Sequence, residues 1–100
     1  MKVYITTSSY WHPDVCDNGW RSEISGVFKH EEDAIESIKK SADGEIAFAK
    51  VMNEKVSRFE YDSKCLIFVP VNDFESPKYS IKTENGKGVV WRAVFEKEAV

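Results

Sequence analysis

The sequence predicts an α+β fold, with an antiparallel or mixed sheet of about five strands and one or two helices on one face. Three observations lead to this prediction. Residues 31–42 carry one narrow apolar face at helical spacing. Several short segments rich in β-branched and aromatic residues lie on both sides of that stretch in the chain. Asn85-Gly86 separates two of these segments and is the best hairpin signal in the sequence.

The helix expected over residues 31–42 has charges that suit its dipole. Three acidic residues lie in its first turn and two lysines lie near its end. Its apolar residues fall at spacings of one, four and eight, which places them on one face: Ala34, Ile35, Ile38 and Ala42. Asp43-Gly44 predicts the end of this helix. Residues 45–56 fit either a second helix or a strand, and we favour a helical segment that gives way to a strand near Val56.

The strand signals surround the helix. A strand that precedes it contains Ile24 and residues 27–28, and Gly26 interrupts that strand as a bulge or a close backbone approach would. The other expected strands are residues 3–7, 56–61, 65–71, 79–83 and 89–95.

Three of these segments carry more specific expectations. Residues 65–71 form the most apolar run and are expected to fill the sheet interior, although Pro70 cannot donate to a ladder. Both faces of residues 89–95 are largely apolar, so this strand is expected to be covered on both sides. Asn85-Gly86 is expected to form a type I′ turn, with positive φ at both residues.

Length and composition narrow the class of protein. A chain of 100 residues with 42% apolar residues is expected to be a single domain, residues 1–100, with a small core. The formal net charge of −3 and the interspersed charges argue against a nucleic-acid-binding protein. No apolar run is long enough to span a bilayer, and no export signal is visible, so the expected location is the cytoplasm.

Residues 8–21 have no clear period and contain three large aromatic residues. One interpretation is a wide hairpin whose aromatic side chains close over the end of the core. The other is a recognition surface, because Trp, Tyr and Arg dominate interface energetics. On the second interpretation, acidic residues in the loop would complement a basic target. The candidate contact residues are Tyr10, Trp11, Asp14, Asp17, Trp20 and Arg21.

Four residues suggest chemistry without forming a recognisable motif. Two are histidines, His12 and His30, and two are cysteines, Cys16 and Cys65. Their spacing matches no strong zinc pattern, so neither a metal nor a cofactor is predicted. Cys65 opens the most apolar run, where burial would make it inert. Whether Cys16 is reactive or pairs with Cys65 stays open.

Three segments resemble the start of small single-domain proteins found in phages and prophages. They are Lys2-Val-Tyr-Ile, Gly26-Val-Phe and Glu31-Glu-Asp-Ala-Ile, in an order expected to give strand, loop, strand and helix. The resemblance covers about the first 42 residues. The class includes inhibitors of host defence, anti-CRISPR proteins among them, and it shares no site motif from which a residue could be carried over. The resemblance therefore implies a small inhibitor.

These observations lead to one main hypothesis and two alternatives. The main hypothesis is a non-enzymatic protein-binding module, a phage-encoded inhibitor that occupies a surface of a host defence complex. The first alternative is a small enzyme that depends on a metal or on Cys16 with His12 or His30. The second is a homodimer whose copies pair through a sheet edge.

Overall fold

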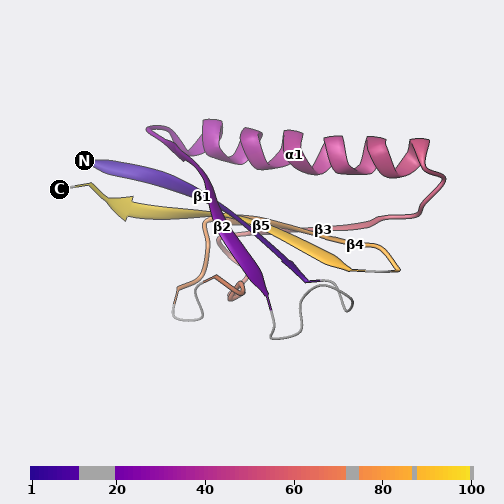
Figure 1. Cartoon of the computed structure of the whole chain (residues 1–100). Helices are drawn as coiled ribbons and strands as arrows, with labels where there is room; N and C mark the ends of the chain where they lie inside the picture. Colours follow the sequence, from indigo (N-terminus) through magenta and orange to yellow (C-terminus); the bar gives the residue numbers. More distant parts are fainter. Residues whose placement is uncertain (12–19, 72–74, 87, 100) are drawn as a thin grey trace.

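A five-stranded antiparallel sheet with one long helix on one face forms the fold, which confirms the predicted α+β class (Figure 1). The computed structural model describes residues 1–11, 20–71, 75–86 and 88–99. The strand order across the sheet is β2-β1-β5-β4-β3. The elements are β1 (Lys2–Trp11), β2 (Arg21–Phe28), α1 (Glu31–Val51), β3 (Ser57–Asp62), β4 (Tyr79–Glu84) and β5 (Val89–Glu98).

The helix α1 begins where the sequence predicts but continues past Gly44. The prediction that Asp43-Gly44 ends the helix is wrong, and the separate helical segment expected after residue 45 is the continuation of α1. The stop comes at Asn53, which has a φ of 57°. The Asn53 N–H donates to the Lys50 carbonyl at 3.1 Å, and the Glu54 N–H donates to the Ala49 carbonyl at 2.8 Å. This pair of hydrogen bonds is a Schellman motif, with asparagine in the left-handed position that glycine usually takes.

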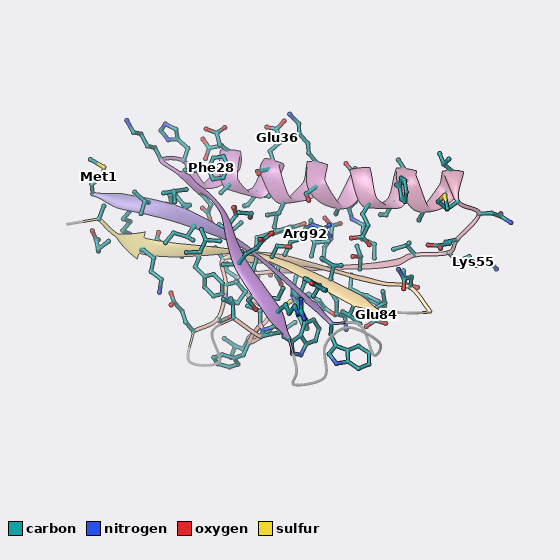
Figure 2. All side chains as sticks on the ribbon, in the orientation of Figure 1. Met1, Phe28, Glu36, Lys55, Glu84 and Arg92 are labelled. Carbon is teal, nitrogen blue, oxygen red and sulfur yellow. The ribbon has the colours of Figure 1, made fainter. Side chains whose placement is uncertain are left out.

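The predicted apolar face of α1 packs on the sheet. Ala34, Ile38 and Ala42 are buried against Ile81 and Val94, and Ile35 is half-buried against the same cluster. Figure 2 shows Phe28 and Arg92 in the layer between α1 and the sheet, while Glu36 lies on the outer side of the helix. Within the part of the chain that the structure describes, no helix combines the length and apolar character needed to cross a membrane.

The strand β5 is covered on both faces, as predicted. Val94 faces the helix, whereas Ala93 and Phe95 pack on the other side against Val69. The cover on that second side is the segment between β3 and β4, which lies across the sheet from α1 (Figure 1). Because β5 pairs with β1 on one edge and β4 on the other, it is the central strand of the sheet.

The prediction of an interior strand over residues 65–71 is wrong. The segment runs as turn and coil, with a single bridging residue at Val69. Its side chains alternate: Val69 is buried, whereas Leu66 and Phe68 are 82% and 51% exposed. A run this apolar predicts an interior strand, but here the segment packs Val69 onto the face of a sheet whose strands already pair with one another. Pro70 also removes one donor that a strand would need.

The hairpin between β4 and β5 forms at the predicted place with a different turn. Glu84 pairs with Val89, which leaves a four-residue connection over residues 85–88. Among the described residues other than glycine, only Asn53 has a positive φ, so the type I′ prediction for Asn85 is wrong. The Asn85 side chain instead accepts a hydrogen bond from the Gly88 N–H at 2.8 Å, which closes the wider turn.

The edge strand β3 is fastened to its neighbours by charged and polar side chains. Arg58 forms an ion pair with Asp43 on α1. The Tyr79 hydroxyl on β4 donates to Glu60 Oε1 at 2.7 Å. Burial is the larger cause and this bond to Glu60 the smaller one, and together they raise the pKa of Tyr79 to about 12. Tyr79 is therefore neutral at physiological pH, and its hydroxyl keeps its proton for this bond.

The strand β2 has the bulge that Gly26 predicts. Thr6 pairs with Gly26 and Thr7 pairs with Ile24, so Ser25 is the extra residue. A Cβ at position 26 would lie 2.9 Å from the Phe28 ring and 3.2 Å from Thr6 Oγ1. Gly26 thus allows close backbone approach.

Two glycine substitutions test this description of the backbone. We expect Gly44→Ala to raise the free energy of unfolding by about 0.5–1 kcal/mol, because Gly44 is inside a helix and alanine costs less conformational entropy there. Apart from the chain neighbours and the nearby backbone of the helix itself, no described atom lies within 4 Å of the added Cβ. Gly26→Ala is the matched control and is expected to lower stability, because its Cβ meets Phe28. Urea denaturation of both variants measures the effects, and a destabilised Gly44→Ala protein would contradict the continuous helix.

Candidate functional site

Four of the predicted contact residues meet at one end of the β1–β2 pair. In the antiparallel register of these strands, Tyr10 is opposite Arg21 and Ser9 is opposite Ser22. The Ser9 and Ser22 hydroxyls are 2.8 Å apart, which ties the two strands beneath this end. We call Tyr10, Trp11, Trp20 and Arg21 the aromatic end.

The three aromatic side chains of this end are partly exposed to a similar degree. Tyr10 is 39% exposed, Trp11 37% and Trp20 39%. Strand alternation places Tyr10 on the helix side of the sheet and Trp11 on the other side. Trp20 is therefore no more buried than Trp11. Residues 8–11, expected in a long loop, belong to β1 instead.

The other predicted site residues fall into two groups. Asp14, Asp17, His12 and Cys16 lie outside the described residues, so charge complementarity to a basic target and a Cys16-based site stay predictions. Cys65 was expected to be buried, but it is exposed, because its segment is not an interior strand. Among the residues that are described, no group of three or more His, Cys, Asp or Glu could hold a metal ion.

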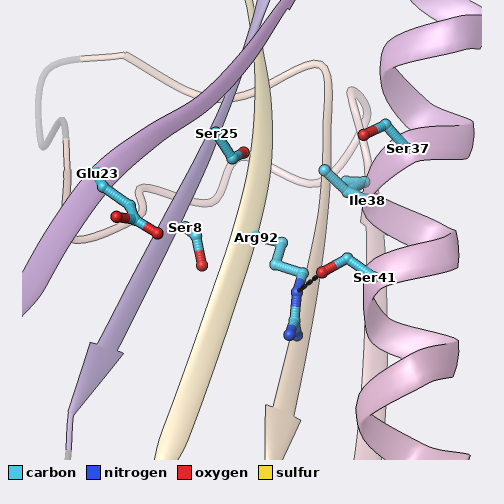
Figure 3. Close-up of a pocket in the computed structure, with 7 residues that line it drawn as sticks. All are labelled: Ser8, Glu23, Ser25, Ser37, Ile38, Ser41 and Arg92. Atoms are coloured by element: carbon cyan, nitrogen blue, oxygen red, sulfur yellow. Dashed lines mark hydrogen bonds between the residues drawn. The ribbon is translucent and has the colours of Figure 1, made fainter.

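A second feature, which the sequence did not single out, is a polar cavity between α1 and the sheet. Its volume is about 190 Å³. Figure 3 shows side chains from β1, β2, β5 and α1 around it. The lining residues are Ser8, Glu23, Ser25, Ser37, Ile38, Ser41 and Arg92. We call this space the wedge cavity.

Arg92 on β5 is held firmly beside the wedge cavity. Its Nη1 lies 2.8 Å from Glu45 Oε1 on α1, and its Nε donates to Ser41 Oγ at 2.9 Å. Thr83 Oγ1 also donates to Glu45 Oε1 at 3.0 Å. Only 11% of the Arg92 side chain is exposed, so the ion pair with Glu45 largely replaces its lost hydration.

The sequence did contain a signal for this site. Within residues 89–95, Arg92 is the charged residue on the strand face that also holds Val90 and Val94. Ser37, Ser41 and Glu45 follow at four-residue spacing on α1, in a polar row beside the apolar face. A charged residue on an apolar strand face, together with a polar helical row, would have indicated a buried polar contact.

Comparisons with known proteins add nothing to this geometry. No protein-family model, no curated protein and no solved structure matches the chain.

The Arg92–Glu45 pair gives a testable consequence for stability. We expect Glu45→Gln to lower the free energy of unfolding by roughly 1–3 kcal/mol, because a nearly buried guanidinium loses its charged partner. Glu36→Gln is the matched control, since Glu36 pairs with Lys40 at an exposed position and should change stability by less than about 1 kcal/mol. Chemical denaturation measures both, and equal effects would mean that the buried pair does not hold α1 to the sheet.

Proposed function

We propose that this protein is a non-enzymatic protein-binding module whose contact surface is the aromatic end. One observation carries the proposal: the end of β1 and the residue directly before β2 present three large aromatic side chains at the same end of the sheet, each more than one-third exposed. Aromatic residues and arginine are the types that contribute most to protein interfaces. An aromatic group that keeps this much exposed surface gains further burial when a partner covers it.

The backbone beneath the aromatic end supports a binding role. The strand β1 pairs with β2 on one side and β5 on the other up to Tyr10, so this aromatic side chain projects from a doubly bonded strand. Trp11 follows and still pairs with Val89. Anchors on a rigid strand lose less conformational entropy on binding than anchors on a free loop.

The exposed apolar surface continues from the aromatic end along the edge strand β2. Ile24 is 66% exposed and Val27 is 62% exposed. Both side chains lie on the side of the sheet that α1 does not cover, and Trp11 lies on that side as well. A partner seated on the aromatic end would therefore meet further apolar surface along β2.

We further propose that the partner is a host protein complex involved in defence and that the contact takes place in the cytoplasm. This part of the proposal rests on the resemblance of the first 42 residues to small phage proteins and on the sequence composition. The chain would then inhibit its target by covering a surface, without chemistry of its own.

A matched pair of aromatic substitutions tests the proposal. We expect Trp11→Ala to leave the melting temperature nearly unchanged and to weaken partner binding by about 2 kcal/mol or more, on the order of thirty-fold in affinity. Phe59→Ala is the control, because Phe59 is 41% exposed on β3, at the opposite edge of the sheet. A pull-down from host lysate identifies the partner, and titration then measures its affinity for the wild-type protein and both variants. Equal binding by the Trp11→Ala and wild-type proteins would refute the assigned surface.

A further inference from the structure

The wedge cavity exists because small side chains line the place where β1 and β2 diverge from α1. Where α1 contacts the sheet, Ala34, Ile38 and Ala42 fill the gap. On the adjoining row of the helix, Ser37 and Ser41 are too short to do so, and the cavity opens there. The side chains that β1, β2, β5 and α1 contribute to the cavity wall are therefore all polar, except Ile38.

One wall of the wedge cavity carries an uncompensated negative charge. Glu23 on β2 projects toward Ser8 (Figure 3). Within the described ranges, neither an ion pair nor a hydrogen bond reaches its carboxylate. A ligand that brings a positive charge to this wall would meet an acceptor that no described side chain occupies.

The opposite wall is formed in part by Arg92, whose side chain lines the same cavity. Arg92 Nη1 forms the ion pair with Glu45 and donates to Thr83 Oγ1, and its Nε donates to Ser41 Oγ. Its Nη2 has no hydrogen-bond partner in the described part of the chain. Because three bonds already fix the guanidinium plane, this edge is preorganised to receive a carboxylate.

Hydroxyl groups lie between the two charged walls. Ser8 is on β1, and Ser25 shares a 2.9 Å hydrogen bond with Thr6. Figure 3 shows both serines between Glu23 and Arg92. At roughly 30 Å³ per water molecule, the cavity has the space of about six waters, which suits a molecule with a similar number of non-hydrogen atoms.

We propose that the wedge cavity binds a small free α-amino acid, with its ammonium group at Glu23 and its carboxylate at Arg92 Nη2. A simple carboxylate would place a negative charge near the unpaired Glu23. A simple amine would bring a positive charge close to Arg92 and leave the Nη2 donors unused. A zwitterion pairs with both walls and leaves the net charge of the site unchanged. This site is separate from the aromatic end and does not depend on the function proposed for it.

An NMR titration with L-serine tests the proposal. We expect saturable shifts of the Arg92 Nε–H and of the backbone amides of the lining serines, with a Kd on the order of 1 mM or lower. Ethanolamine lacks the carboxylate and lactate lacks the ammonium group, so each should bind at least about tenfold more weakly. Equal binding by either compound would overturn the proposal, as would the absence of saturable shifts with L-serine.

Two variants locate the ammonium group. We expect Glu23→Gln to weaken L-serine binding at least about tenfold, because it removes the negative charge but keeps the shape. Its melting temperature should not change, since Glu23 is exposed and has no ion pair among the described residues. Glu54→Gln is the control, because Glu54 is an exposed carboxylate outside the lining of the wedge cavity. Equal L-serine affinity in the two variants would refute the assigned site.

Discussion

The burial of β5 on both faces is the constraint on which the rest of the structure depends. Ala93, Val94 and Phe95 are 1%, 0% and 3% exposed, although neighbours in a strand point to opposite sides. Two covers are therefore required, and the chain supplies α1 on one face and the segment around Val69 on the other. Pairing with β1 and β4 then satisfies both backbone edges of β5, so the sheet is organised outward from this strand.

Both candidate sites lie where this central packing stops. The helix presents an apolar row to the sheet centre and the polar row of Ser37, Ser41 and Glu45 beside it. The polar row secures α1 to β5 through Arg92 and leaves the wedge cavity toward β2. Beyond the helix-covered region, the end of β1 and the residue before β2 carry partly exposed aromatic side chains. The same arrangement thus explains a firmly held centre and the partly exposed aromatic side chains at its margin.

Local patterns predicted much of the fold because they reflect local physics. The start and apolar face of α1 follow from charge and spacing, and the bulge in β2 follows from Gly26. The end of α1 does not follow from the local sequence, because buried Ala49 and the Asn53 cap extend the helix through Gly44. The segment around Val69 is not the strand that its apolar run predicts, because apolar composition does not show whether backbone partners remain in the sheet. The aromatic end was predicted by residue type, whereas the wedge cavity arises from long-range contacts between four elements that sequence spacing alone does not bring together.

Native-state hydrogen exchange tests the central role of β5 most directly. We expect the amides of Ala93, Val94 and Phe95 to exchange only through global unfolding, because both of their faces and both strand edges are covered. Amides of the edge strand β2 should exchange faster, through local opening. If the β5 amides exchanged as fast as those of β2, at a free energy well below that of global unfolding, then β5 would not be the element that holds the two layers together.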